Sequence, residues 1–550
     1  MNNGGNITCP LCTDKVDKLL YRFHVESERK VIAKIKEQNP GWTENDGICS
    51  RCVDYYNTAI LMEKGVFPSI GPHFSVKSAD DFIILPTALR LDADPGYTGK
   101  GVTICFIDSG FYLHPDLVSY ENRVKKIVDI NSPMNPREYF STPHQESWHG
   151  TMTTVVCAGD GYISNGLYKG IASDAELVLL KVQNESGKIP TENIVKALQW
   201  VLENHILYNI KIVNMSLGDD EDLSLRSSRV DQLAEKLIAK GIIVVAAVGN
   251  DEYGSIKPPA NALNVIAVGG VDDDNLLGSV AGKLYHSSFG KTMDALMKPE
   301  LMAHAIWIAA PILPGTKEQE EAEALYKLVN TPDYELKPAL AEIVNKIILD
   351  ACVLERDDVS FIRDAVKQRI QAAKYISANY MHVDGTSFAA PIVSSIIAQL
   401  LEANPNLTPA YIRELLFSTA RRIDGIPAEK QGFGVIQARK ALLKVLKREP
   451  VMKEHPSPFI NFSKKTIEFY IQNDCAAQIA LAGNFNEWAK CELLMEPGRN
   501  GIWKIGIPLL PPGLYQYKFY IDESRWMEDV DNPYREPDGF SGFNSILVID

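Results

Sequence analysis

Apolar residues in the middle of the chain fall into short runs that alternate with amphipathic segments. Four near-continuous apolar runs predict buried strands, at residues 102–107, 177–182, 212–215 and 242–248. Residues 191–207 and 228–239 instead repeat apolar positions at helical spacing. Strands that alternate with helices in this way indicate an α/β fold, with a parallel sheet covered by helices on both faces.

The pattern becomes purely helical between residues 315 and 375. Two sets of apolar residues there each fall on one helical face, namely Leu336, Leu340, Ile343 and Ile347, then Ile362, Val366, Ile370 and Ala373. We therefore expect two or three helices inserted into an α/β domain that spans residues 82–447. A further helical stretch is predicted at 408–447.

The last part of the chain has a period of two. A proline-containing segment, 448–460, reads as a linker. Beyond it, residues 467–471, 503–507 and 515–520 alternate or are strand-like, with Gly and Pro turns between them. Residues 461–550 are therefore expected to form a small immunoglobulin-like β-sandwich.

Charge and cysteine content narrow the setting of the protein. The chain has 56 Lys and Arg against 70 Asp and Glu, a net charge of −14, which argues against nucleic acid as a partner. We found no apolar run near the roughly 18 residues that span a bilayer, so no membrane partner is expected. The first residues lack a basic and apolar secretory signal, and the 9 cysteines are an odd number. The sequence predicts a reduced, cytoplasmic protein.

Two Cys-x-x-Cys pairs lie near the amino terminus, Cys9 with Cys12 and Cys49 with Cys52. Each pair can supply two thiolates, and two pairs complete a closed tetrahedral shell around zinc. We expect residues 1–60 to form a module with one structural zinc ion and no part in catalysis. The alternatives are a redox dithiol and unpaired surface thiols.

Three polar side chains stand where strands end or helices begin. Asp108 ends an apolar strand, His149 opens an apolar helical run, and Ser387 opens another. A serine hydroxyl needs a base to take its proton, and imidazole is suited to that task near neutral pH. A carboxylate on the second ring nitrogen fixes the tautomer. Asn250, at the end of another buried strand, could donate to a developing oxyanion together with the backbone N–H of Ser387.

These residues lie in segments that resemble the subtilase family of serine proteases. The matching segments are 100–103, 108–110 (DSG), 114–117 (HPDL), 149–151 (HGT), 213–218 (VNMSLG), 246–250, 265–269, 298–300 and 385–391 (GTSFAAP). The resemblance implies a peptidase over 82–447, acting on protein or peptide substrates, with Asp108 orienting, His149 as base, Ser387 as nucleophile and Asn250 as oxyanion donor. The alternative is a catalytically silent scaffold that binds glycans or proteins.

The same resemblance implies further sites. Ser216, Leu217 and Gly218 correspond to the strand that pairs with the substrate backbone. Asp116 matches a position that binds calcium in some relatives, with residues 160–170 as the partner loop, so calcium is a second candidate metal.

Two smaller expectations come from neighbouring residues. The acidic run Asp219 to Asp222 follows the substrate strand and predicts a preference for Lys or Arg near the scissile bond, with a solvated acidic loop as the alternative. Cys105 and Cys157 lie in apolar runs and are expected to be core residues.

The carboxyl-terminal module resembles the glycogen-binding sandwich of AMP-activated kinase β subunits and branching enzymes. The matching segments are 481–488 (LAGNFNEW), 512–519 (PGLYQYKF), 525–526 and 543–546. In that family two tryptophans stack on sugars while a lysine and an asparagine bond the hydroxyls, which implies Trp488, Trp526, Lys518 and Asn544 here. The expected partner is a glycogen-like α-glucan. The alternatives are a docked protein, or tryptophans that belong to the core.

Overall fold

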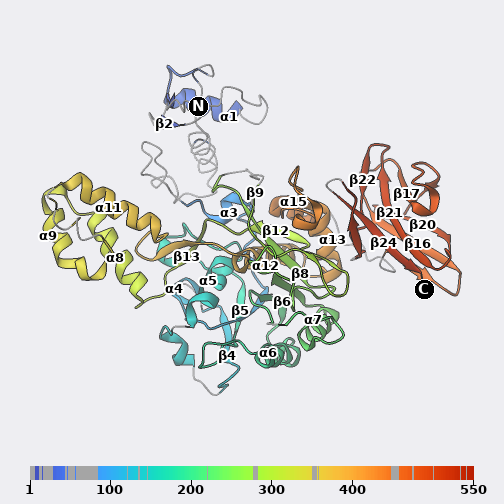
Figure 1. The fold of residues 1–550 in the computed structure, drawn as a ribbon, viewed down its shortest axis with the longest axis horizontal. Coiled ribbons are helices and arrows are strands. Elements are labelled where there is room, and N and C mark those ends of the chain that lie inside the picture. The colour runs from blue at the N-terminus through green and yellow to red at the C-terminus, as the bar shows by residue number, and fades with distance from the viewer. Residues whose placement is uncertain are drawn as a thin grey trace.

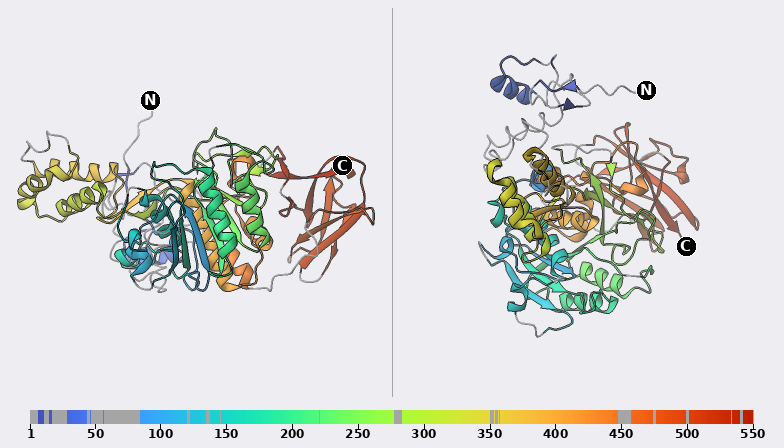
Figure 2. Two further views of the ribbon diagram at one scale, coloured as in Figure 1. Left: turned by 90° about the horizontal axis from the view of Figure 1, so that it is seen from below. Right: turned by 60° about the vertical axis from the view of Figure 1, so that its left-hand side comes forward.

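The computed structural model describes most of the chain beyond residue 83 and a few pieces before it (Figure 1). It describes 84–446 and 457–549, with gaps at 120–121, 134–136, 145, 220, 277–282, 350–352, 354–355, 357, 474–475, 499–500, 533 and 540–541. Before residue 84 it describes 7–10, 15–16, 29–43, 46 and 56. The central sheet lies between the helical insertion at one end of the long axis and the carboxyl-terminal sheets at the other (Figures 1 and 2).

A parallel sheet forms the centre of the molecule, as the apolar runs predict. Its strands follow the order β12-β8-β7-β6-β3-β5-β4, and each neighbouring pair on this path is parallel. The bounds are β3 Thr103–Asp108, β4 Val124–Asp129, β5 Glu176–Lys181, β6 Ile210–Met215, β7 Ile243–Ala247, β8 Ile266–Asp272 and β12 Leu301–His304. The short β9 (Lys283–Leu284) pairs antiparallel with β8.

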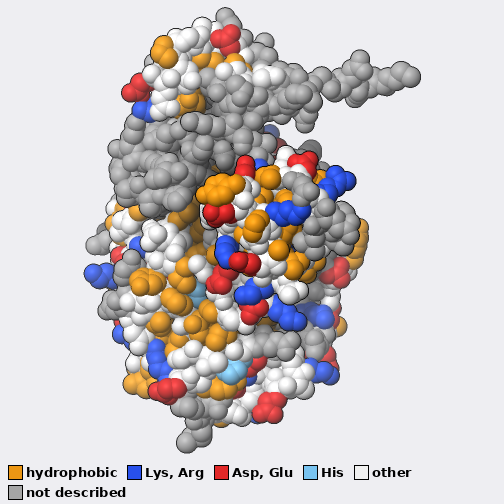
Figure 3. All heavy atoms as spheres, turned by 90° about the vertical axis from the view of Figure 1, so that its left-hand side faces the viewer, with side chains coloured by type: hydrophobic (Ala, Val, Ile, Leu, Met, Phe, Trp, Pro, Cys, Tyr) orange, Lys and Arg blue, Asp and Glu red, His pale blue; other side chains and the backbone are white. Residues whose placement is uncertain are grey.

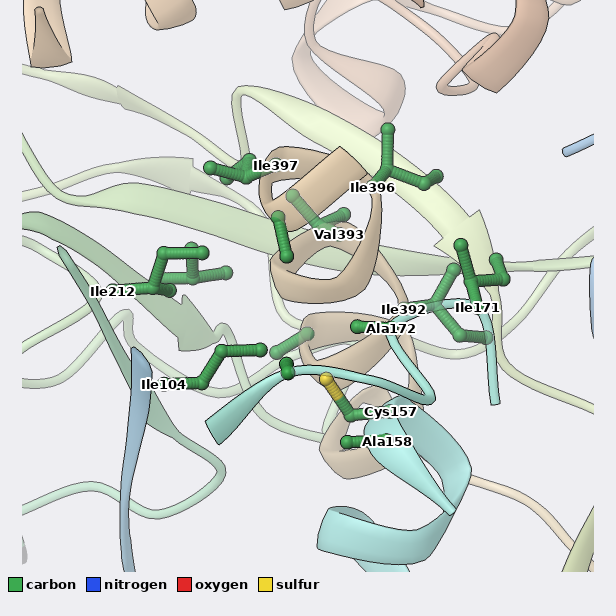
Figure 4. Close-up of a cluster of buried hydrophobic side chains, with 14 of the residues drawn as sticks. Ile104, Cys157, Ala158, Ile171, Ala172, Ile212, Ile392, Val393, Ile396 and Ile397 are labelled. Atoms are coloured by element: carbon green, nitrogen blue, oxygen red, sulfur yellow. The ribbon is translucent and has the colours of Figure 1, made fainter. Parts of the chain in front are cut away.

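Helices cover both faces of this sheet and bury alternate residues of its strands. Ile104 and Phe106 of β3 pack with α5 (Ser147–Ala158) and α12 (Thr386–Ala403) on one face. Cys105 and Ile107 pack with α6 (Thr191–Asn204) and α7 (Arg229–Ala239) on the other. Figure 4 shows the first of these clusters, with α12 running through it. The two-sided burial explains why the strands are apolar throughout.

The cysteines of the two cores have the structural role that the sequence predicts. Cys105 and Cys157 are fully buried in apolar clusters, and Figure 4 shows Cys157 among aliphatic side chains. Burial raises the pKa of both thiols well above its usual value, so neither forms a thiolate readily.

Helix α12 corrects the expectation that no apolar segment approaches 18 residues. Its 18 residues are long and apolar enough to cross a membrane, judged by length and composition alone. However, 83% of that window is buried inside the protein, and its apolar side chains belong to the main core cluster. It has the burial of a core helix.

The helical insertion leaves and rejoins the domain through a two-stranded antiparallel stalk. The stalk pairs β13 (Ile308–Pro311) with β14 (Tyr380–Val383), from Ile308 opposite Val383 to Pro311 opposite Tyr380. Between them, α8 (Lys317–Val329), α9 (Asp333–Ile343) and α11 (Val359–Ala372) enclose their own apolar cluster. That cluster holds the two predicted helical faces, although Ile347 lies beyond the end of α9.

The stretch 408–447 is helical only in part. It contains α13 (Pro409–Thr419), α14 (Ala428–Gln431) and α15 (Ala438–Leu446). Between α13 and α15, Arg421 and Val435 form an antiparallel bridge. Gly425, Gly432 and Gly434 take positive φ angles there. The glycines allow the chain to turn back, which helical periodicity does not reveal.

The carboxyl-terminal region consists of two antiparallel sheets that share a core. One sheet has the order β15-β16-β20-β19 and the other β18-β17-β21-β24-β23, with β22 paired to β21. The longer strands are β16 (Thr466–Gln472), β17 (Ile479–Gly483), β20 (Ile502–Pro508), β21 (Gly513–Ile521) and β24 (Phe543–Ile549). The short ones are β15 (Phe459–Asn461), β18 (Leu493–Leu494), β19 (Glu496–Pro497), β22 (Arg525–Met527) and β23 (Arg535–Pro537). Phe469 and Phe519, from different sheets, lie in one apolar cluster.

These sheets pack directly against the domain that contains the parallel sheet. Arg535 is buried, donates to the carbonyl of Met297 at 3.2 Å, and lies over the rings of Phe433 and Phe543. An ion pair between Arg422 and Glu528 crosses the same contact. The second region is therefore attached by apolar, cation–π and ionic contacts as well as by the chain.

Candidate active site

Asp108 and His149 form a close pair at the carboxyl edge of the sheet. Asp108 is the last residue of β3, and its Oδ1 lies 2.7 Å from Nδ1 of His149 in the first turn of α5. Asp108 is 1% exposed, and its Oδ2 accepts a 3.0 Å hydrogen bond from Thr153. The carboxylate is thus held from both sides, which directs Nε2 of His149 toward the site.

Burial and charge act in opposite directions on His149. Desolvation lowers its pKa, but the negative charge of Asp108 and the hydrogen bond to it together raise the pKa by more. The net effect is a pKa above the usual 6.5. The carboxylate therefore stabilises the imidazolium that forms when His149 accepts a proton.

The glycine that follows His149 lets the two elements approach. A Cβ at Gly150 would lie 2.3 Å from the carbonyl oxygen of Gly110 and 3.0 Å from Cβ of Asp108. Any larger residue would push α5 away from the end of β3 and lengthen the Asp108–His149 bond. This close packing gives the physical reason for the His-Gly sequence.

Ser387 lies in the first turn of α12, directly after Gly385 and Thr386. Gly385 has a φ of 139°, a conformation that side chains disfavour, and this turn sets Ser387 at the helix start. Its Oγ donates to the carbonyl oxygen of Ser216 at 3.4 Å, and among the described residues no hydrogen bond joins it to His149. His149 does approach the same helix turn, with its ring centroid 6.2 Å from that of Phe388. Such a bond often forms only when substrate is present.

Asn250 is oriented by the residue before the serine. Its Oδ1 accepts two 2.9 Å hydrogen bonds from Thr386, one from the backbone N–H and one from the hydroxyl. These bonds fix the amide so that Nδ2 is the group left to donate. The ideal Cβ position of Gly385 lies 3.6 Å from that Nδ2, so Asn250 adjoins the turn before Ser387.

Ser216, Leu217 and Gly218 continue directly from β6 toward Ser387. The Ser216 hydroxyl donates to the backbone carbonyl of Ser387 at 2.8 Å, and accepts from Asn214 at 3.2 Å. Ser216 is buried, whereas Gly218 is exposed. The segment is therefore fixed at one end against the α12 turn and open at the other.

The acidic run after this segment does not form the four-carboxylate cleft mouth that the sequence suggests. Asp219 is 5% exposed, and its carboxylate accepts from the Thr191 hydroxyl at 2.5 Å. Asp220 lies outside the described residues, while Glu221 and Asp222 are exposed. The buried Asp219 anchors this loop to Thr191 and is not available to attract a basic substrate. Only the other carboxylates of the run could do so.

Asp116 has protein donors on both carboxylate oxygens. Its Oδ1 accepts from the backbone N–H of Ile163 at 2.9 Å, and its Oδ2 accepts from the Tyr380 hydroxyl. The 160–170 loop therefore meets Asp116 as expected, but as a donor. Within the described part of the chain, no group of three or more His, Cys, Asp or Glu could hold a metal ion. Both carboxylate oxygens of Asp116 are therefore already hydrogen-bonded within the protein.

The predicted zinc site falls mostly outside the described residues. Cys12, Cys49 and Cys52 are not described, whereas Cys9 is buried. Cys9 directly follows β1 (Ile7–Thr8), which pairs antiparallel with β2 (Lys15–Val16). Cys9 thus lies where the first strand of a short hairpin ends, a position that is compatible with a metal-binding knuckle.

The two tryptophans of the carboxyl-terminal region touch one another outside its core. Trp488 and Trp526 are half-buried, with ring centroids 6.0 Å apart and planes at 79°. Tyr520 lies 4.6 Å from Trp526, and Lys490 lies over both of those rings. The apolar cluster between the sheets contains neither tryptophan. The interpretation of these rings as core residues is therefore wrong.

The polar partners predicted for a sugar are bonded within the protein. Lys518 is 7% exposed and forms an ion pair with Asp538. Asn544 donates to the side-chain oxygen of Gln516 at 3.1 Å. The structure thus exposes an aromatic surface, but the two groups expected to bind hydroxyls already have partners.

Several residues that shape the site were missed from the sequence. Thr153 holds the second oxygen of Asp108, and Thr386 orients Asn250. Thr153 lies four residues after His149, one helical turn along α5, which is the signal that could have identified it. Thr386 precedes the nucleophile, but its role depends on a distant residue and has no local signature.

Comparison with known proteins identifies the family of this chain. The model of the subtilase family matches residues 99–434, more than half of the chain. Serine protease AprX of Bacillus subtilis is 29% identical over 358 residues, which cover 63% of this chain and 67% of that protein. Subtilisin Savinase of Lederbergia lenta is 30% identical over 181 residues, or 33% of this chain and 59% of the relative.

Among solved structures, the prenylagaramide maturation protease PagA is similar with a TM-score of 0.40 and 16% sequence identity. The match covers 63% of this chain and 94% of PagA.

Proposed function

Since the chain belongs to the subtilase family and is a subtilisin-like serine protease, we propose that Ser387, His149 and Asp108 carry out its hydrolysis of peptide bonds. The observation that carries this assignment is the 2.7 Å contact between Asp108 Oδ1 and His149 Nδ1, beside the turn that bears Ser387. The assignment is also supported by β3, α5 and α12, which bring these three groups to one edge of the sheet.

In this mechanism His149 accepts the proton of the Ser387 hydroxyl as the oxygen attacks the substrate carbonyl. Asp108 binds the opposite ring nitrogen and stabilises the imidazolium. His149 then returns the proton to the leaving amine, which leaves an acyl group on Ser387. A water molecule, deprotonated by the same imidazole, releases the second product and restores the serine.

Charge develops on the substrate oxygen during both attacks. Asn250 Nδ2 is proposed to donate to this oxyanion, together with the backbone N–H of Ser387 at the start of α12. Support comes from Thr386, whose two hydrogen bonds hold the Asn250 amide in one orientation. A preorganised donor of this kind costs no rearrangement in the transition state.

The competing interpretation is a silent scaffold, and one experiment separates the two. Wild-type protein should be labelled by a fluorophosphonate probe, which reacts only with an activated serine, and should cleave a peptide library. Ser387→Ala should lose both labelling and cleavage while its melting temperature stays the same. Equal cleavage by the two proteins would contradict the assignment of Ser387.

A second candidate function is binding of a glycogen-like α-glucan by the carboxyl-terminal region. The contact between Trp488 and Trp526 outside the core favours it, because the apolar faces of sugars stack on exposed aromatic rings. Full-length Ser387→Ala protein should then co-sediment with glycogen, and Trp488→Ala should remove that binding. No co-sedimentation of the Ser387→Ala protein would leave a docked protein as the better candidate partner, whereas glycogen binding retained by both single tryptophan variants would contradict the site.

We also propose a cytoplasmic protein with one structural zinc ion held by Cys9, Cys12, Cys49 and Cys52. The buried Cys9 at the end of a paired strand fits this donor set, and thiolate ligands require a reducing compartment. When bound, zinc would stabilise the fold of this module. Elemental analysis of protein purified without chelator should find about one zinc per chain. A zinc content of zero would exclude this site.

A further inference from the structure

A cavity of 540 Å³ lies between α5 and the base of the helical insertion. Trp148 and Met152 line it from α5, while Leu313 and Pro314 line it from the segment that joins β13 to α8. Trp148 is 48% exposed. Pro143, Ile312, Met381 and Val383 add further apolar side chains, so the cavity is suited to an apolar side chain.

This cavity borders the reaction centre through Trp148. Trp148 immediately precedes His149, and the two rings make an edge contact with centroids 5.2 Å apart. Val383, which also lines the cavity, is the last residue of β14 and lies four positions before Ser387. A group in the cavity would therefore lie near the base, on the other side of the Trp148 ring contact.

The position of the cavity indicates which side of the scissile bond it serves. His149 must lie next to the leaving amine, because it donates the proton that the amine takes. Trp148 in the cavity lining contacts the His149 ring, whereas the lining includes neither Asn250 nor any residue of 216–218. It is therefore placed for residues that follow the scissile bond, on the side of the leaving group.

Two of the three polar residues in the lining already have contacts within the protein, and the third is exposed to solvent. The hydroxyl of Thr316 accepts the N–H of Gln319 as the cap of α8. Glu318 is exposed in the first turn of that helix. His144 stacks on Tyr139 with ring centroids 4.1 Å apart. Hydrophobic side chains also gather on the face of the molecule that carries the insertion (Figure 3).

We propose that this cavity, which we call the insertion pocket, binds a bulky apolar side chain that follows the scissile bond. The inference rests on the proposed peptidase function and assigns the insertion a direct part in substrate selection. Leu313 and Pro314 then act as specificity-determining residues, and the preferred substrates carry Leu, Met or Phe just after the cleaved bond.

The test uses internally quenched peptides that share one sequence before the scissile bond and differ only after it. The wild-type kcat/KM should be at least about tenfold higher for peptides with Leu or Phe in the leaving half than for Ala. Pro314→Glu should reduce this ratio to below about threefold and raise the relative rate for Lys severalfold. Ratios between peptides cancel any general loss of activity.

Met293→Glu is the matched control, because it adds the same charge at a position 65% exposed on the turn between β10 (Gly290–Lys291) and β11 (Met297–Lys298). Its peptide ratios should equal those of wild type. If Pro314→Glu does not fold, Pro314→Ala should still reduce the Phe-to-Ala ratio without favouring Lys.

The outcomes distinguish the two proposals. Failure of wild-type protein to cleave any peptide would contradict the peptidase function itself. Cleavage with no preference for Leu or Phe after the scissile bond would overturn the insertion pocket alone. The pocket would also be overturned if Pro314→Glu and Met293→Glu gave identical ratios.

Discussion

The catalytic centre differs from the aromatic face of the carboxyl-terminal sheets, which is formed by Trp488, Tyr520 and Trp526. The difference lies in which side-chain atoms are already bonded to other parts of the protein. Both contain four residues expected from family resemblance. At the centre, internal hydrogen bonds go to Oδ1 of Asn250 and Nδ1 of His149, which leaves Nδ2 of Asn250 and Nε2 of His149 toward the site, and only the long 3.4 Å bond to Ser216 involves the Ser387 hydroxyl. At the aromatic face, the ammonium of Lys518 and the amide of Asn544 are themselves bonded to neighbours.

The difference teaches that a residue that matches a family's functional position indicates function only when its hydrogen-bond partners are also known. A buried Asp–His pair costs desolvation energy and is maintained where the imidazole must become charged. A lysine paired with a carboxylate contributes to packing whether or not a ligand ever binds. The predictions below therefore test whether the first region is active and whether the second is closed to sugars.

The largest effect is expected from Asp108→Asn. The variant keeps the shape of the side chain but no longer supports the reactive tautomer of His149, so kcat should fall by about 10⁴-fold. Peptide hydrolysis measures the loss, and Lys518→Met serves as a control that should hydrolyse the same peptide like wild type. Wild-type kcat in Asp108→Asn would show that the Asp108–His149 contact is only structural.

Asn250→Ala should lower kcat by about 10²–10³-fold with little change in KM, as removal of an oxyanion donor does in subtilisin. Thr386→Val tests the positioning role of the threonine hydroxyl, and a loss of about tenfold is expected because the backbone N–H bond to Asn250 remains. A change confined to KM in either variant would contradict these roles.

The pH profile should report the raised pKa of His149. The imidazole must be neutral to accept the Ser387 proton, so kcat/KM should fall about tenfold for each pH unit below its pKa. Since Asp108 raises that pKa above 6.5, the acid limb should lie above pH 6.5 in wild-type enzyme. Replacing the carboxylate in Asp108→Asn should move this limb to lower pH, and a limb that stays in place would assign it to another group.

The smallest effect concerns the aromatic face. Asp538→Asn releases Lys518 from its ion pair, and binding of maltooligosaccharides should rise a few-fold if the lysine can then reach a hydroxyl. Calorimetry on full-length Ser387→Ala protein measures the binding of these oligosaccharides. Binding that is unchanged in Asp538→Asn would mean that Lys518 has no part in it.

The stability of the region tests whether the tryptophans belong to its core. Trp526→Ala should leave the melting temperature nearly unchanged, whereas replacing the buried Phe519 in Phe519→Ala should cost about 3–5 kcal/mol of stability.

The sequence predicted the features whose cause is local. The strands β3, β5, β6 and β7 were visible because each is buried on both faces and is therefore a continuous apolar run. Asp108 was visible because it ends such a strand, and His149 and Ser387 were visible because each opens an apolar helix. Their convergence follows from the parallel arrangement, in which carboxyl ends share one edge.

The features that escaped prediction depend on contacts between distant segments. Lys518 meets Asp538 only because β21 and β23 both pair with β24, a register that the strand pattern does not specify. Asp219 was read as part of an acidic loop, but its burial depends on Thr191 at the start of α6. The break of 408–447 depends on the bridge between Arg421 and Val435.

The antiparallel stalk of the insertion has a consequence for how this chain could be shortened. Pro311 and Tyr380 are paired partners, so the two ends of the inserted segment lie side by side. A tight two-residue turn could join them and close β13 and β14 into an ordinary hairpin. The insertion is thus attached like a cassette, which makes it a natural point for excision, for exchange with the corresponding segment of a relative, or for grafting a new recognition element next to the nucleophile.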